Sequence, residues 1–123
     1  MKKILIIDDD KTNQDILSKA FSQKDYQVVS VYNSLLSFEK IAEHKPDLII
    51  LDILMPGIDG FQVLETMKEK SIIPKIPIII LTALSEESNF KKSLALGAED
   101  CLLKTDYNPC ELVEKVTQRL KNK

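Results

Sequence analysis

The sequence predicts an α/β fold, in which a five-stranded parallel sheet carries five helices on its two faces. Residues 4–7, 48–51 and 78–81 are short apolar runs, typical of strands buried on both faces beneath covering helices. Between the runs, apolar residues recur at helical spacing. The 123 residues are enough for one domain with a continuous core.

The first half of the chain is predicted to contain two strands and two helices. Residues 4–7 form the first strand, and residues 26–31 form a second, more polar strand that belongs at an edge of the sheet. Asp10 or Thr12 caps the helix between them, and Asn33 or Ser34 caps the next helix. The residues expected to face the core are Ile16, Leu17, Ala20 and Phe21 in the first helix, and Leu35, Phe38, Ile41 and Ala42 in the second.

The second half is built around the strand that ends at Asp52. Asp59 can cap the following helix, and Gly97 ends the helix between the strands predicted at 76–82 and 100–103. Asn108 with Glu111 predicts the start of the last helix, because each side chain can bond the backbone N–H of the other. The core-facing residues expected here are Phe61, Leu64 and Met67, then Leu112, Val113, Val116 and Leu120.

Alternation of strands and helices predicts parallel pairing through right-handed crossovers. The expected strand order is 2-1-3-4-5, the flavodoxin-like form of the doubly wound sheet. No repeat or linker divides the sequence, so we expect a single domain over residues 1–123.

Composition argues against several classes of protein. The net charge of -2 gives no general reason to bind nucleic acid or an anionic membrane. No apolar run approaches the ~20 residues of a membrane span, and the N-terminus does not resemble a signal peptide. We expect Cys101 and Cys110 to be free thiols of a cytoplasmic protein.

Polar residues follow four of the five predicted strands: Asp8 and Asp9, Asp52, Thr82 and Lys104. The carboxyl ends of parallel strands meet at one edge of a sheet, so these side chains should lie together. Converging carboxylates repel one another, and Mg²⁺ with its preference for oxygen ligands would offset the repulsion. The lysine and the hydroxyl could then hold a phosphoryl group that an aspartate attacks.

The same residues resemble the receiver domain of two-component response regulators of the chemotaxis-regulator kind. The resemblance covers essentially the whole chain and rests on Asp8-Asp9, residues 51–60, Thr82-Ala83 and Lys104. It implies that Asp52 accepts a phosphoryl group, that Thr82 responds to this group and that Lys104 pairs with it.

The resemblance also implies a cofactor and partners. Asp9 and Asp52 would bind Mg²⁺ together with the backbone carbonyl of Leu54, while Asp8 would act largely through water. The phosphoryl donor would be a histidine kinase or a phosphotransfer protein in a phosphorelay. An output partner or a second receiver would bind the face formed by the fourth helix, the fifth strand and the fifth helix, without direct contact to nucleic acid or membrane.

The sequence departs from the family pattern at several positions. Cys101 stands where the family usually has an aromatic residue, and Thr105 replaces the usual proline after the lysine. We therefore expect a trans bond between Lys104 and Thr105, because a cis bond before a non-proline residue costs ~3 kcal/mol. Leu54 and Leu84 lie where side chains flank the hydrolytic water, and neither can orient water by hydrogen bonding. This predicts a long-lived aspartyl phosphate.

Two other functional classes remain open at this point. A metal-dependent phosphatase with an aspartyl nucleophile commonly needs a second acid two residues further on, and here that residue is Leu54. A receiver-like adaptor could bind its partners without phosphorylation, although all the reacting groups are present. The leading interpretation is a signalling switch that catalyses only its own phosphoryl transfer and dephosphorylation.

Overall fold

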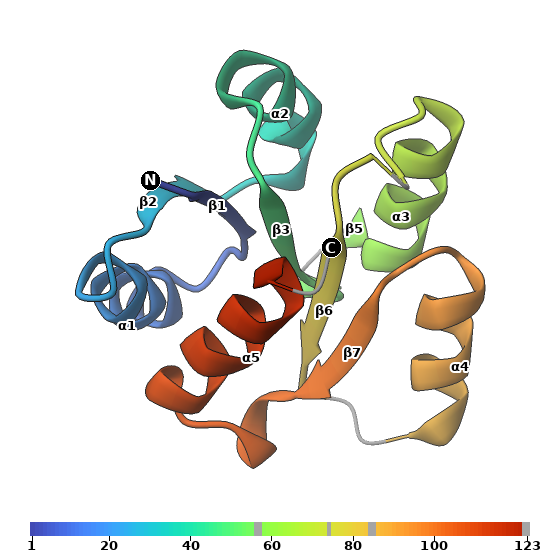
Figure 1. Ribbon diagram of the computed structural model, residues 1–123. Coiled ribbons are helices and arrows are strands. Elements are labelled where there is room, and N and C mark those ends of the chain that lie inside the picture. Colours follow the sequence, from blue (N-terminus) through green and yellow to red (C-terminus); the bar gives the residue numbers. More distant parts are fainter. Residues whose placement is uncertain (56–57, 74, 84–85, 122–123) are drawn as a thin grey trace.

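The computed structural model describes residues 1–55, 58–73, 75–83 and 86–121. Its main sheet has five parallel strands in the order β2-β1-β3-β6-β7 (Figure 1), which confirms the predicted order 2-1-3-4-5 and the edge position of the second strand. The five strands are β1 (Lys3–Ile7), β2 (Gln27–Val31), β3 (Leu48–Asp52), β6 (Ile78–Thr82) and β7 (Asp100–Leu103).

Five α-helices cover the two faces of this sheet. They are α1 (Lys11–Ser22), α2 (Ser37–His44), α3 (Gly60–Glu69), α4 (Glu87–Ala95) and α5 (Pro109–Lys121). Two short 3₁₀ helices, η1 (Ser34–Leu36) and η2 (Lys104–Asp106), precede α2 and α5. None of the helices in the described part of the chain has the length and apolar character that a membrane span needs.

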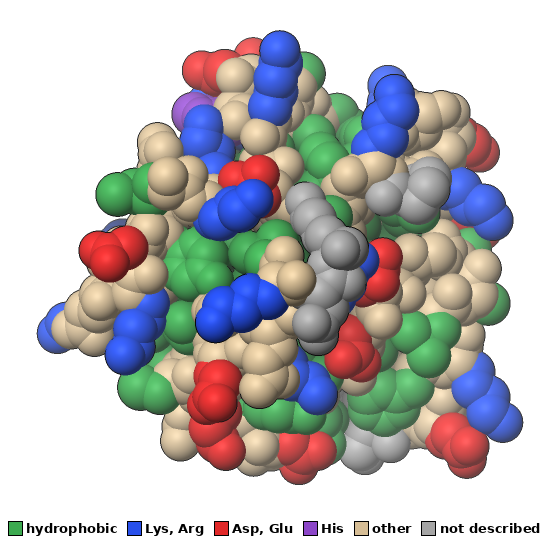
Figure 2. All heavy atoms as spheres, in the orientation of Figure 1, with side chains coloured by type: hydrophobic (Ala, Val, Ile, Leu, Met, Phe, Trp, Pro, Cys, Tyr) green, Lys and Arg blue, Asp and Glu red, His purple; other side chains and the backbone are tan. Residues whose placement is uncertain are grey.

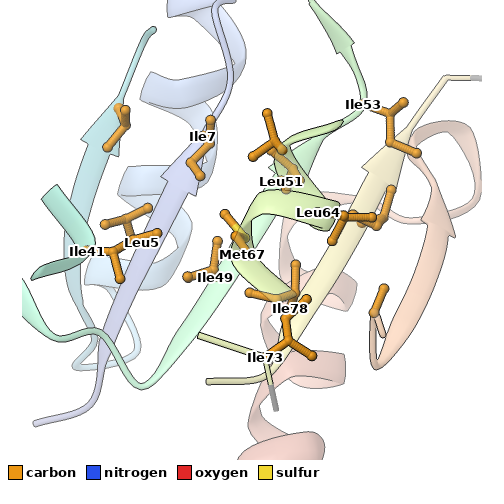
Figure 3. Packing of buried hydrophobic residues seen from close by; sticks show 14 of the residues in the cluster. Leu5, Ile7, Ile41, Ile49, Leu51, Ile53, Leu64, Met67, Ile73 and Ile78 are labelled. Carbon is orange, nitrogen blue, oxygen red and sulfur yellow. The ribbon is translucent and has the colours of Figure 1, made fainter. Parts of the chain in front are cut away.

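Alternate residues of each central strand point to opposite faces, so the core has two halves. One half packs α1 and α5 against the sheet, and its members include Phe21, Leu102 and Val116. The other half packs α2 and α3 against it, as Figure 3 shows for Ile41, Leu64 and Met67 near the isoleucines and leucines of β1, β3 and β6. The central strands β1, β3 and β6 are therefore buried on both faces.

The structure confirms several predicted helix ends. The Asp10 carboxylate accepts a hydrogen bond from the Asn13 N–H at 3.3 Å and caps α1. Asn108 and Glu111 bond each other's backbone N–H at 2.8 and 3.0 Å. Gly97, with φ of +106°, follows α4 in a backbone conformation that side-chain-bearing residues rarely adopt.

The predicted inward faces of the first two helices are partly wrong. Ile16 is 48% exposed, whereas Gln14 is buried with Leu17 and Phe21. In the second helix Leu35 is 79% exposed, because η1 changes the register of the turn before α2. Ala42 is exposed as well, and the buried residues of that segment are Ser34, Ser37 and Ile41. The inward residues predicted for α5 are confirmed.

A short antiparallel hairpin, β4 (Leu54–Met55) with β5 (Ile58–Asp59), follows β3 and was not predicted. It leads the chain back so that the Gly60 N–H donates to the Ile53 carbonyl at 3.3 Å. A Cβ on Gly60 would lie 2.5 Å from the Ile53 Cα and 2.9 Å from its carbonyl oxygen. Only glycine allows this approach, which places the start of α3 beside the end of the central strand.

Replacing Gly60 with alanine should therefore destabilise the protein by about 2 kcal/mol, because the neighbouring atoms are backbone and cannot give way. Urea unfolding measures this change. Helix propensity alone predicts the opposite sign, a gain of up to about 1 kcal/mol. Gln62→Ala, at an exposed position of the same helix, is the control and should stay within about 0.5 kcal/mol of wild type. A Gly60→Ala protein as stable as wild type would contradict the close approach.

Candidate functional site

Three carboxylates lie together at the carboxyl edge of the sheet. Asp8, Asp9 and Asp52 each offer an oxygen, and these oxygens lie within 4.8 Å of one another. The cause is the register of β1 and β3, which sets Ile7 beside Leu51 and therefore places the acids that follow next to each other. Asp8 is 2% exposed and Asp52 is 5% exposed, whereas Asp9 faces solvent. The predicted acidic cluster is thus assembled.

Hydrogen bonds fix both the backbone N–H and the carboxylate of Asp8. Its backbone N–H donates to the Val31 carbonyl at 3.0 Å, which ties it to β2. Its carboxylate accepts from the Asp10 N–H at 3.0 Å through one oxygen and from the Asn13 side-chain amide at 2.5 Å through the other. Sequence reasoning missed Asn13, although a polar residue in the first turn of a helix that follows three acids could have signalled it. The acid is held before any ligand arrives.

Lys104 supplies positive charge to the cluster. Its Nζ lies 3.1 Å from the Asp52 Oδ2 and 3.6 Å from the Asp8 Oδ2, and its side chain is 27% exposed. Burial by itself would lower the pKa of Lys104, but the charge of Asp52 and its hydrogen bond, and then Asp8, together raise that pKa above its usual value. The lysine is therefore a firmly charged partner for two of the three acids.

Thr82 completes the set of predicted residues at this edge. It is the last residue of β6 and is fully buried. The register of β3 with β6 places Leu81 beside Asp52, so Thr82 lies one residue beyond the acid, and it pairs with Leu103, directly before Lys104. The strand ends thus place Thr82 between the two elements that carry Asp52 and Lys104.

Leu54 and Leu84 are the two leucines predicted to flank the hydrolytic water. The backbone of Leu54 begins β4, two residues after Asp52, but its side chain lies outside the described residues. Leu84 also lies outside them. The carbonyl of Leu54 therefore stays a predicted ligand.

Cys101, at the position where an aromatic residue is usual, is buried and faces α4. Its thiol lies beside the side chain of Ser93, whose hydroxyl donates to the Asn89 carbonyl at 2.8 Å. Burial raises the pKa of the thiol, the neighbouring Ser93 side chain opposes this and the charge of Asp100 adds to it. Both cysteines are free, as predicted.

The donor set indicates what the site can bind. It consists of carboxylate oxygens around a small volume, which suits a hard divalent cation such as Mg²⁺. The same edge of the sheet carries the positive charge of Lys104 and the hydroxyl of Thr82, groups that suit an anion beside that cation. Such an arrangement supports phosphoryl transfer, where a protein mainly provides position and charge compensation.

Comparison with known proteins agrees with this chemistry. The response regulator receiver domain family matches residues 4–117, so the chain belongs to this family of two-component signalling domains. It is 35% identical over 115 residues to the phosphate regulon transcriptional regulatory protein PhoB of Pseudomonas aeruginosa, covering 94% of this chain and 50% of that protein. It is 33% identical over 120 residues to response regulator GtcR of Aneurinibacillus migulanus, covering 98% and 48% respectively. The chain thus spans about half the length of these relatives.

Solved structures give the same fold over the whole chain. The receiver domain of the Francisella response regulator 1452 superposes with a TM-score of 0.89 at 27% identity, covering 99% of this chain and 98% of that one. The BeF3-activated N-terminal receiver domain of Klebsiella pneumoniae RstA superposes with a TM-score of 0.87 at 32% identity, covering 97% and 98%. The phosphatase and adaptor alternatives are not favoured by these likenesses.

Removing the charge of Lys104 should destabilise the metal-free protein. In Lys104→Met, Asp8 and Asp52 lose their cation, and we expect a loss of about 2 kcal/mol at pH 7. Because its folded-state pKa is raised, the lysine stabilises the fold fully below the ordinary lysine pKa of about 10.4 and loses this contribution as pH rises through the folded value. Urea unfolding in a chelator, at neutral and at alkaline pH, measures both effects.

The control is Lys91→Met, which breaks a 3.5 Å pair with Glu87 on the surface of α4. Its lysine and glutamate are 77% and 82% exposed, so the change should stay below about 0.5 kcal/mol. Equal effects of the two substitutions would show that Lys104 does not compensate the acids.

Proposed function

We propose that this chain is a phosphorelay receiver whose Asp52 accepts a phosphoryl group from a histidine kinase or phosphotransfer protein in the cytoplasm. The observation that carries the proposal is the cluster itself: three acids with oxygens within 4.8 Å of one another, and a lysine 3.1 Å from Asp52. Figure 2 shows acidic and basic side chains interspersed over the face drawn there, so that face offers no broad basic field for nucleic acid.

The hydrogen bonds suggest how the acids would share Mg²⁺. Both oxygens of Asp8 already accept from Asp10 and Asn13, so this acid suits a water-mediated contact. Asp9 is exposed and can bind the ion directly, together with Asp52 and the Leu54 carbonyl. The bound ion would neutralise the acids and draw the oxygens of the phosphoryl group into place.

In the transfer step, a carboxylate oxygen of Asp52 attacks the phosphorus of a phosphohistidine. The new O–P bond forms as the P–N bond breaks, and the departing imidazole keeps the bonding electron pair and takes a proton from solvent. Lys104 would exchange one of its carboxylate contacts for a phosphoryl oxygen. Loss of the phosphoryl group follows by attack of water on the same phosphorus.

The switch would pass from Thr82 toward α4, β7 and α5. Phosphoryl charge would draw the hydroxyl of Thr82 toward the site and favour one arrangement of that face, to which an output partner or a second receiver binds. Cys101 lies on the same side of the sheet as Thr82, two residues before Leu103, which pairs with Thr82. Its contact with Ser93 would then couple β7 to α4 in place of an aromatic ring.

The direct test uses acetyl phosphate with Mg²⁺ and intact-protein mass spectrometry. Wild type should gain the mass of one phosphoryl group, and Asp52→Asn should gain none because the amide is not a nucleophile. Asp15→Asn is the matched control, since Asp15 is an exposed acid on α1 and should leave phosphorylation unchanged. Phosphorylation of Asp52→Asn at the wild-type rate, or of wild type without divalent cation, would contradict the proposal.

The lifetime of the product tests the role of the two leucines. If neither Leu54 nor Leu84 orients the hydrolytic water, the aspartyl phosphate should persist for minutes or longer in Mg²⁺ buffer. Mass spectrometry at intervals after removal of the donor measures its decay. Leu54→Asn should shorten the lifetime, since its amide can hydrogen-bond water. Decay of the wild type within seconds, or an unchanged rate in Leu54→Asn, would disprove this part of the proposal.

A further inference from the structure

Gln14 is a fully buried polar residue to which the reaction described above assigns no role. It lies in the first turns of α1 and is 0% exposed. The other buried residues of that helix, Leu17 and Phe21, are apolar and pack in the core. A glutamine in their row is unexpected, because burying an amide costs free energy unless its hydrogen bonds are met.

The side-chain nitrogen of Gln14 bonds three backbone carbonyls. Its Nε2 donates to Ile6 at 2.9 Å, to Val31 at 3.0 Å and to Asp8 at 3.1 Å. An amide nitrogen has two hydrogens, so at least one of them is shared between two oxygens. One side chain therefore fastens the carboxyl ends of β1 and β2 to the start of α1.

The bond to Asp8 matters most for the site. The carbonyl of Asp8 belongs to the peptide that joins Asp8 to Asp9, so Gln14 fixes the peptide unit between these two acids. The preceding residue, Asn13, holds the Asp8 carboxylate at 2.5 Å. One turn of α1 thus fixes the side chain of Asp8 and the peptide that joins Asp8 to Asp9. These are two of the three clustered acids.

The oxygen of the same amide shows that this arrangement has a cost. Within the described part of the chain, the Gln14 Oε1 is buried without a hydrogen-bond partner. An unsatisfied buried acceptor costs about 1–3 kcal/mol, so stability alone would favour an apolar residue of similar shape. The three bonds made by the nitrogen point instead to a requirement for a fixed backbone at this spot.

We propose that Gln14 is a positioning residue for the divalent cation site, which holds the Asp8–Asp9 peptide in the geometry that the ion requires. The proposal rests on the cation-dependent function proposed above. Mg²⁺ demands near-ideal coordination geometry, so a small shift of this peptide weakens binding. Residues that orient ligands without touching the metal typically change affinity 10- to 100-fold when removed.

The test is Gln14→Met, which keeps the length of the side chain and removes both donors. Isothermal titration of the chain with MgCl₂ should show affinity lowered about tenfold. Phe21→Leu is the matched control: it loosens the packing at the other end of the same helix, where Phe21 contacts the ring of Tyr26, and should lower stability while leaving Mg²⁺ affinity unchanged where the protein is folded. A purely structural role for Gln14 predicts equal changes in the two variants, and that result would overturn the inference.

Other outcomes separate this inference from the function beneath it. Wild-type affinity in Gln14→Met would disprove the positioning role and leave the phosphorylation proposal standing. Failure of the wild type to bind Mg²⁺ would defeat the phosphorylation proposal first. If Gln14→Met does not fold, NMR of the wild type is the test. The side-chain amide protons of Gln14 should exchange slowly with solvent, and their chemical shifts should change on titration with Mg²⁺. Chemical shifts that stay constant during the titration would count against the proposal.

Discussion

The repulsion between carboxylates at one edge of the sheet is the constraint on which the rest of the structure depends. Two of these acids are almost completely buried, where like charges interact far more strongly than in water. The fold keeps them together through a charged lysine, helix-derived amide donors and backbone bonds from the neighbouring strand. A doubly wound sheet suits this task because its strand ends meet at one place while its core lies elsewhere.

Much of this architecture could be predicted because its causes are local. Strands buried on both faces require continuous apolar runs, so β1, β3 and β6 were recognisable from composition alone. The residues at their ends could therefore be predicted to meet at one edge of the sheet, and they do. The capping pair of Asn108 and Glu111 was recognisable because its bonds connect residues three apart.

The remainder depended on contacts between distant segments. Helical periodicity predicted that Ile16 faces the core, but Ile16 is exposed and Gln14 is buried. The partners of Gln14 are carbonyls of β1 and β2, which no pattern within α1 reveals. The hairpin of β4 and β5 has strands of two residues each, too short for any periodic signal. Pairing of Cys101 with Ser93 likewise joins β7 to α4 across the fold. Sequence patterns therefore predicted the clustering of the acids with Lys104 better than the residues that hold them there.

The late position of Lys104 has a consequence for how the protein is made. This lysine follows Asp52 by 52 residues and comes directly after β7, the fifth strand of the main sheet in chain order. Until β7 docks on β6, the clustered acids lack this cation, and their mutual repulsion opposes the pairing of β1 with β3. A chain cut short before β7 would lack the cation that lies 3.1 Å from Asp52, and its clustered acids would stay uncompensated.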